Sequence, residues 1–281
     1  MFLPFASKVR QLRRKSLVGQ IIVILLGMQL FFLATFSGFS LPTPTAKNLS
    51  AYIHNVLIKK LNLLPDTYQR KARALFPSLN LPPMPVRLSL YIPQAPAAIF
   101  VGCVLGPVLG AVAAGLFLLL GFTAPAAGLH IFVSGGEGKY FIQPGFGYML
   151  GMIVASWCSG WLVNPVRRSW RQLLAVVSGV ASIHILGVIY LLGSSLFISL
   201  TDPKHQMFDW LQWLFEEIRN MTWYQLPYDV IFSILVVGLA FPFRWLIEVL
   251  IAPDIAFRSK PQADFQEILS TQQEAHEFFH S

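Results

Sequence analysis

An all-α membrane protein, built as a bundle of six transmembrane helices with a cytoplasmic N-terminus, is the fold class that this sequence predicts. Charged residues make up only 12% of the chain and hydrophobic residues 55%, whereas a soluble domain carries about 25% charged residues. The mean hydropathy is +0.59. The apolar residues also gather in runs of helix length, separated by polar or basic segments. A chain with so few charged residues cannot cover a surface that faces water, so its apolar helices must face a bilayer.

The net charge of +8 could suggest a nucleic-acid partner. However, most of the Lys and Arg residues lie between the apolar runs, where they would not form one patch on a folded face. We interpret the charge as membrane topology, because cytoplasmic loops carry an excess of basic residues. No nucleic-acid partner is therefore expected.

The first apolar run, residues 17–39, is long enough to span a bilayer, which takes about 20 residues. It exceeds the apolar core of about 7–15 residues of a signal peptide, so we expect a retained helix. Basic residues precede it and place the N-terminus in the cytoplasm: Lys8, Arg10, Arg13, Arg14 and Lys15.

An insertion at about residues 40–92 follows on the outer side. Residues 51–64 have apolar side chains at helical spacing, which predicts an interfacial amphipathic helix. The insertion is rich in basic residues: Lys47, Lys59, Lys60, Arg70, Lys71, Arg73 and Arg87. That number disagrees with an outer position, although long loops translocate largely regardless of charge.

The later apolar runs predict five more membrane segments. Gly106-Pro107 breaks the stretch after residue 94, because proline costs a helix interior about 3 kcal/mol. The expected segments are 95–105, 108–121, 145–163, 173–200 and 226–251. Residues 1–251 thus form a single transmembrane domain, and residues 252–281 form a polar cytoplasmic tail.

The glycine-rich stretch "SGGEGKYFIQPGFGYMLG", which begins at residue 134, raises the question of a phosphate-binding loop. A Walker A loop needs a first glycine, and Ser or Thr after the lysine. Aligning on Gly138 and Lys139 puts Val133 and Tyr140 at those two places. Both requirements fail, so a nucleotide site is not expected.

On the predicted topology, polar and aromatic clusters from three segments converge on the outer face. They lie around Tyr91 and Gln94, in the glycine-rich loop, and around Asp229. A carboxylate within an apolar run is costly and suggests function. The alternative for Asp229 is a favourable charge in the first turn of a helix, beside Pro227. His184 is interpreted as a neutral histidine bonded to a neighbouring helix.

Small residues recur at four-residue spacing in segment 145–163: Gly147, Gly151, Ala155 and Ser159. This ridge permits close helix contact. We favour internal packing, with docking of a partner as the alternative. Ser16, Gly19 and Gly27 form a looser small-residue face on the first helix, and Arg244 and Glu248 have the spacing of a helical ion pair.

The sequence predicts no catalytic residue, no cofactor and no metal. The loops hold no metal-ligand spacing and no nucleophile–base pair, so an enzyme is not expected. Cys103 and Cys158 both lie in apolar runs without a Cys-x-x-Cys pair. We interpret them as small buried hydrophobic residues.

Four motifs occur in order: "YIPQAPAAIFVGCVLGPVLGAVAAGLFLLLG", the glycine-rich loop, "QPGFGYMLG" and "LPYD". Together they resemble the BioY family, the biotin-binding S subunit of energy-coupling-factor (ECF) vitamin transporters, in a form similar to cyanobacterial members. The resemblance covers residues 91–163 well and the last two helices more loosely. Residues 39–90 and those after 252 have no counterpart in it.

The resemblance implies a six-helix bundle in the cell inner (plasma) membrane, with a vitamin pocket under the outer loops and no chemistry on the ligand. It also implies partners: a transmembrane coupling subunit and two ATPases. The implied biotin-binding residues have distinct roles. Asp229 accepts the ureido N–H groups, Gly135 and Gly136 allow close backbone approach, Tyr148 and Tyr190 pack on the rings, Gln143 donates and accepts, and Lys139 or Arg87 faces the carboxylate.

The chain departs from the family pattern at one place. A lysine often follows the Asp of the last helix by three positions, and here that position is Phe232. An alternative therefore stays open: a structural or partner-binding membrane protein of the same fold that has lost biotin binding or binds another small ligand.

Overall fold

The computed structural model describes residues 16–128, 141, 143, 145–163, 169–201 and 207–251. The predicted tail and most of the glycine-rich loop, with Gly135, Gly136 and Lys139, lie outside them. The elements are α1 (Leu17–Phe36), β1 (Phe39–Pro42), α2 (Ala46–Leu61), α3 (Asp66–Leu75), η1 (Pro77–Asn80), β2 (Leu88–Tyr91), α4 (Gln94–Leu105), α5 (Pro107–Thr123), η2 (Ala124–Ala127), α6 (Phe146–Val163), α7 (Ser169–Thr201), α8 (Met207–Ile218), the π-helical η4 (Arg219–Trp223) and α9 (Leu226–Leu250).

Four helical stretches within the described residues are long and apolar enough to cross a membrane: Leu17–Phe36, Phe146–Val163, Ser169–Phe197 and Gln212–Leu250. The last includes the end of α8, the π-turn and α9. The helices α4 and α5 are apolar but shorter. The structure is mostly helical, as predicted for a membrane protein, although β1 and β2 form a small sheet; the predicted segments correspond to four helices of spanning length and two short ones.

The break between α4 and α5 is where the sequence predicts it. Gly106 has a φ of 84°, a conformation that glycine adopts without a steric penalty. Pro107 then occupies the first turn of α5, where its missing N–H is not needed. The chain therefore reverses within one turn, and two short helices pack side by side.

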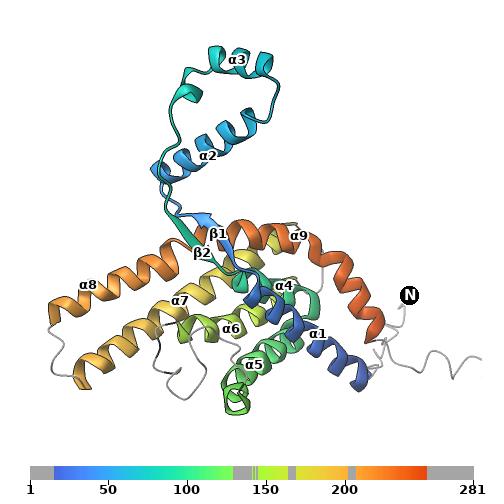
Figure 1. Ribbon diagram of the computed structural model, residues 1–281. Coiled ribbons are helices and arrows are strands. Elements are labelled where there is room, and N and C mark those ends of the chain that lie inside the picture. The colour runs from blue at the N-terminus through green and yellow to red at the C-terminus, as the bar shows by residue number, and fades with distance from the viewer. Residues whose placement is uncertain are drawn as a thin grey trace, which may run out of the picture.

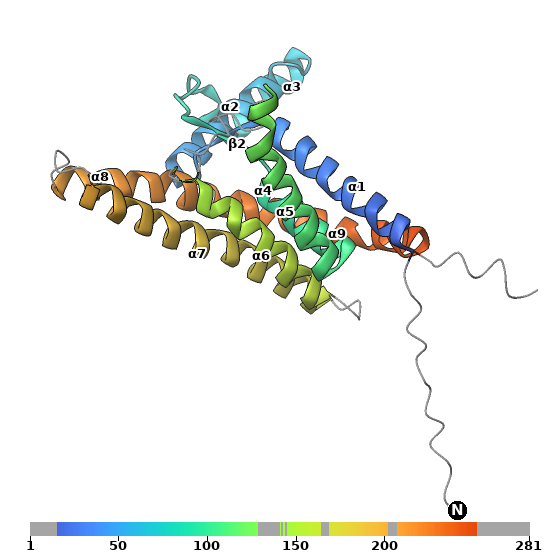
Figure 2. The same ribbon diagram turned by 90° about the horizontal axis from the view of Figure 1, so that it is seen from below.

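The core lies where α6 crosses α4 and α7. The Ser156 hydroxyl donates to the Ala98 carbonyl over 2.8 Å. On the other face, a Cβ at Gly151 would lie only 2.6 Å from the Cα of Ile183. The predicted ridge thus brings α6 against two neighbours at once, which confirms internal packing. Figure 2 shows α6 running along α7.

The first helix packs through its small residues as predicted. Gly19 lies against the backbone at the end of α9, and a Cβ at Gly27 would come within 3.0 Å of Ala113 in α5. The Ser16 hydroxyl caps α1 by accepting from the Gly19 N–H over 3.3 Å. At the same end of the bundle, Arg244 and Glu248 form the predicted ion pair at 3.3 Å.

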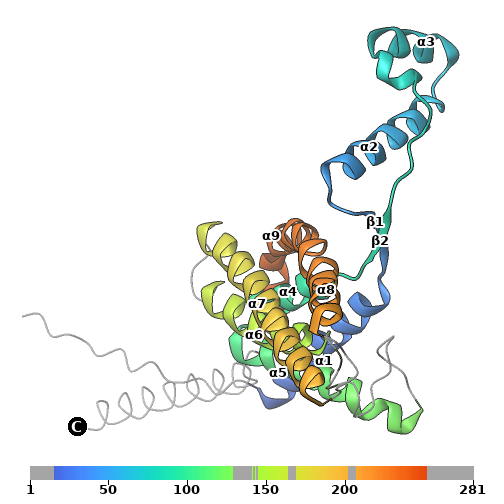
Figure 3. The same ribbon diagram turned by 90° about the vertical axis from the view of Figure 1, so that its left-hand side faces the viewer.

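Residues 39–91 form an arm that projects away from the helix bundle (Figures 1 and 3). Its base is a two-stranded antiparallel sheet in which Phe39 faces Tyr91. The arm carries α2, α3 and η1. The sequence analysis places one helix at 51–64 and no strand. In fact α2 begins at Ala46, because Thr45 caps it, and it ends at Leu61, before Pro65.

Candidate functional site

A cavity of about 440 Å³ opens among α1, β2, α4, α6, α7, α8, η4 and α9. Its volume lies within the range of about 300–1,000 Å³ that is usual for small-molecule pockets. The wall is mainly apolar, with Met149, Met152 and Ile183. The polar residues of the lining come from several elements: Thr35, Gln94, Tyr148, His184, Glu217, Asn220, Gln225 and Asp229.

Asp229 is the centre of the polar wall. It is 5% exposed, and both of its carboxylate oxygens are engaged. The Tyr91 hydroxyl donates to Oδ1 over 2.8 Å, and His184 Nε2 lies 3.1 Å from Oδ2. A buried carboxylate is tolerated only when such partners compensate its lost hydration. Residues far apart in the sequence therefore stabilise this one carboxylate.

Tyr91 is held as a hydrogen-bond donor. Burial and then the Asp229 carboxylate beside it raise the pKa of the Tyr91 hydroxyl. The phenol therefore stays protonated over the physiological range and donates to Asp229. The sequence analysis places Tyr91 in the outer polar cluster but gives it no role.

His184 bonds to the neighbouring helix α9, as predicted, through its Nε2. Its second ring nitrogen, Nδ1, is buried and has no hydrogen-bond partner among the described residues. His184 as a residue lines the cavity. An unpaired buried polar atom costs about 1–3 kcal/mol, so a partner for Nδ1 would be favourable.

Tyr148 is the second residue of the predicted set that lines the cavity. Its hydroxyl and that of Thr222 in η4 are 2.7 Å apart. Its ring meets the His184 ring edge-on, with centroids 6.0 Å apart. Tyr148 thus connects the π-turn to the polar wall.

Tyr190 and Gln143 lie away from this lining. The Tyr190 ring packs edge-on against Phe146 at 5.3 Å, and its hydroxyl donates to the Phe141 carbonyl. The Gln143 carbonyl accepts from the Phe146 N–H over 3.1 Å and starts α6. Both residues contact Phe146, the first residue of α6.

The segment before α9 supplies lining residues that the sequence analysis does not assign to any element. Glu217, Asn220, Met221 and Gln225 come from the end of α8, from η4 and from the turn after it. The stretch "FDWLQWLFEEIRNMTWYQ" alternates apolar and polar residues at helical spacing, a signal that could have located α8. The π-turn carries no such signal.

Phe232, which stands at the position of the frequent lysine, makes an aromatic stack. Its ring lies 5.3 Å from that of Tyr91, nearly parallel, and 6.5 Å from that of Phe39. One turn earlier, the Tyr228 hydroxyl donates to the Pro42 carbonyl. The start of α9 is thereby fastened to the base of the arm, and the place of a cation is taken by packing.

Replacing Tyr91 by Phe is expected to remove the donor to Asp229 Oδ1 while keeping the stack on Phe232. Since hydrogen bonds to charged groups contribute about 1.5–3 kcal/mol, we expect a lower unfolding temperature in detergent. Tyr68→Phe is the matched control, because the Tyr68 side chain is 62% exposed. Equal unfolding temperatures for the two variants would contradict the assigned role of Tyr91.

Comparison with known proteins places this fold in a family. A family model described as the BioY family matches residues 72–248, well over half of the chain. The chain belongs to the BioY family. In this BioY-family chain the matched segment contains every element of the cavity except α1. The elements that lie before the matched segment are α1, β1 and α2. The family resemblance seen in the sequence is thereby confirmed.

One solved structure is similar to this BioY-family chain: the crystal structure of the S-component for biotin from an ECF-type ABC transporter. The two chains are 18% identical, with a TM-score of 0.48. The alignment covers 83% of this chain and 96% of that one. No curated protein sequence matches this chain.

Proposed function

We propose that this chain is the biotin-binding subunit of a membrane transporter, which captures biotin at the outer face for uptake and does not alter it chemically. The observation that carries the proposal is the buried Asp229 carboxylate. It lies in the wall of a largely apolar cavity, in a chain of the BioY family.

The cavity suits the chemistry of biotin, which combines a ureido ring with two N–H donors, a thioether ring and an apolar chain ending in a carboxylate. Each oxygen of Asp229 accepts one bond from the protein and keeps capacity for another, so both ureido N–H groups find acceptors. The Met149, Met152 and Ile183 side chains provide the apolar wall. Gln94 at the start of α4 adds an amide.

In the proposed topology the chain lies in the inner (plasma) membrane, crosses it six times and has its N-terminus in the cytoplasm. In support, α4 is too short to span alone but is buried over nearly its whole length by α5, α6, α7 and α9, and short helices are tolerated at membrane depth where protein shields them. The Asp229 end of α9, the Gln94 end of α4 and the Phe36 end of α1 then meet at the outer face.

The remaining predicted ligand contacts are part of the proposal. Gly135, Gly136 and Lys139 belong to the loop between α5 and α6 and would cover the cavity from outside. Lys139 is proposed as the cation for the biotin carboxylate, since Arg87 lies exposed on the arm. A transmembrane coupling subunit and two ATPases are the proposed partners, and they would supply the energy for uptake.

Phe232 favours a second candidate, a chain that has kept this fold and binds a different small molecule or a membrane partner. At this position of α9 an aromatic stack takes the place of a lysine. A ligand of this second kind would be recognised by Asp229 and His184 without a carboxylate partner on α9.

The deciding experiment is equilibrium binding of radiolabelled biotin to the purified chain in detergent. We expect saturable binding with one site for each chain, and competition by unlabelled biotin. Folding is checked in the same sample by helical circular dichroism and a monodisperse elution profile. Absence of binding at micromolar biotin by folded protein would overturn the biotin assignment and favour the second candidate.

A further inference from the structure

We propose that the arm, residues 39–91, is a binding surface for anionic lipid that lies on the membrane beside the bundle. The surface combines the exposed apolar side of α2 with the basic residues of α2 and α3. This assignment is independent of the ligand in the cavity.

One side of α2 is apolar and uncovered. Its exposed apolar residues repeat at spacings of three and four, as on one face of a helix, and they are Leu49, Tyr52, Ile53, Val56 and Leu57. The exposed fraction is 50% for Ile53 and 51% for Leu57. A contiguous apolar patch of this kind marks an interaction site.

The opposite side of α2 is already occupied. Ala51, His54 and Leu61 are buried, and His54 Nε2 lies 2.9 Å from the Ser78 carbonyl. The Asn55 amide donates to the Met84 carbonyl over 2.7 Å and accepts from its N–H over 2.9 Å. The return segment of the arm therefore covers one side of α2 and leaves the apolar side without a partner among the described residues.

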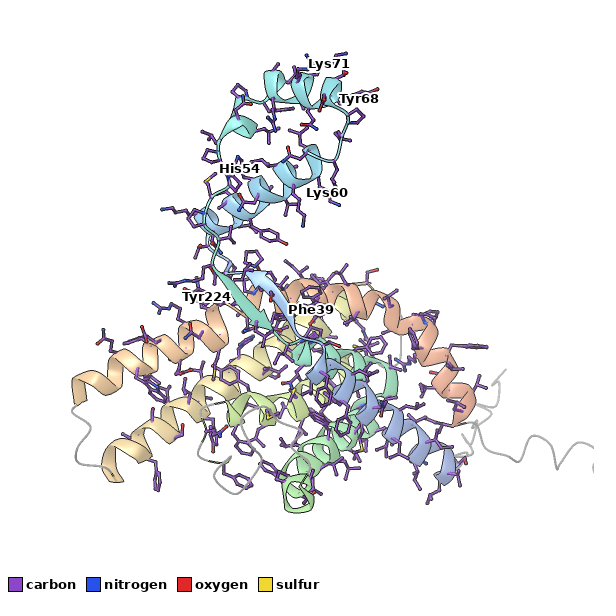
Figure 4. The ribbon with its side chains drawn as sticks, in the orientation of Figure 1. Phe39, His54, Lys60, Tyr68, Lys71 and Tyr224 are labelled. Carbon is purple, nitrogen blue, oxygen red and sulfur yellow. The ribbon has the colours of Figure 1, made fainter. Side chains whose placement is uncertain are left out.

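The charge of the arm identifies the partner. It has seven Lys and Arg residues against one acidic residue, Asp66, and no ion pair joins any of them to a carboxylate in the part of the chain that the structure describes. Figure 4 shows Lys60 on α2, and Lys71 and Tyr68 on α3, extending away from the arm. An apolar face rimmed by cations is typical of helices that lie in an anionic bilayer surface.

The direction of the arm agrees with this partner. Figure 1 shows α1 and α7 running across the picture while the arm rises away from them, and Figure 3 shows it extending beyond the bundle. It leaves between the end of α1 and the start of α4, which is the level where a spanning helix meets the headgroups. An arm that leaves sideways at this level runs along the bilayer surface. Leu90 of its base lines the cavity, so the arm starts at the cavity wall.

The test uses the full chain in nanodiscs with a nitroxide label at one cysteine. Ile53→Cys reports on the apolar side, and Ser78→Cys on the covered side is the matched control, both in a Cys158→Ser background because Cys103 is buried. In phosphatidylcholine with added phosphatidylglycerol, we expect the label at position 53 to lie about 5–10 Å below the headgroups, and the label at 78 to stay in water.

A charge-reversal variant, Lys59→Glu with Lys60→Glu and Lys71→Glu, tests the electrostatic part. Each basic residue near an anionic surface strengthens binding about fivefold. Because three of these charges are reversed, the immersed fraction at position 53 should fall by tenfold or more. Equal water accessibility at positions 53 and 78 would overturn the proposal. So would equal immersion at 53 in phosphatidylcholine alone.

Discussion

Asp229→Asn is expected to weaken biotin binding by about ten- to one-hundred-fold, because a hydrogen bond to a charged group contributes about 1.5–3 kcal/mol. The amide keeps the shape of the carboxylate but replaces one acceptor oxygen by a donor. Its single oxygen can accept two bonds, so it cannot accept from both ureido N–H groups while it also accepts from Tyr91 and His184. The measurement is the Kd for radiolabelled biotin in detergent.

Glu248→Gln is the matched control for this substitution. Glu248 lies on the same helix, is largely exposed and pairs with Arg244 away from the cavity, so we expect its biotin affinity to equal that of the wild type. Unfolding temperatures of both variants separate lost contacts from lost structure. An Asp229→Asn protein that binds biotin as tightly as the control would exclude the carboxylate from the site.

Gly102→Ala is expected to destabilise the bundle more than the addition of a methyl group at Gly193. A Cβ at Gly102 would overlap the Ser156 carbonyl oxygen and the Ser159 hydroxyl of α6. The carbonyl belongs to the backbone of a buried helix, so it cannot move aside. Overpacking of this kind costs about 1–3 kcal/mol. The unfolding midpoint in detergent should fall by about 5–10 °C.

Gly193→Ala provides the comparison, since a Cβ there meets no atom within 4 Å. Both glycines lie inside helices, so both variants gain the same helix propensity of about 1 kcal/mol. The difference between their midpoints therefore measures the α4–α6 contact alone. Similar midpoints would show that this contact yields more easily than the structure indicates.

Much of the helix layout could be predicted because it depends on local chemistry. A bilayer requires long apolar runs, and the runs beginning near residues 17, 145, 173 and 226 become α1, α6, α7 and α9. The Gly106-Pro107 turn follows from backbone geometry that only those residue types favour. The strands of the arm were not predicted, because four residues each are too few for an alternation of apolar and polar side chains to be recognised.

The candidate site depends on contacts that no local pattern encodes. The carboxylate of Asp229 can be recognised from the sequence, because a charge near the start of an apolar run is rare and costly. Its partners come from the tertiary fold: Tyr91 lies 138 residues away and His184 lies 45 away. The tertiary fold also decided that Phe232 stacks on Tyr91 and that the π-turn lines the cavity. Helix periodicity tells which residues face inward, whereas the neighbour that each one meets depends on how helices cross, and that is set by the packing of the whole bundle.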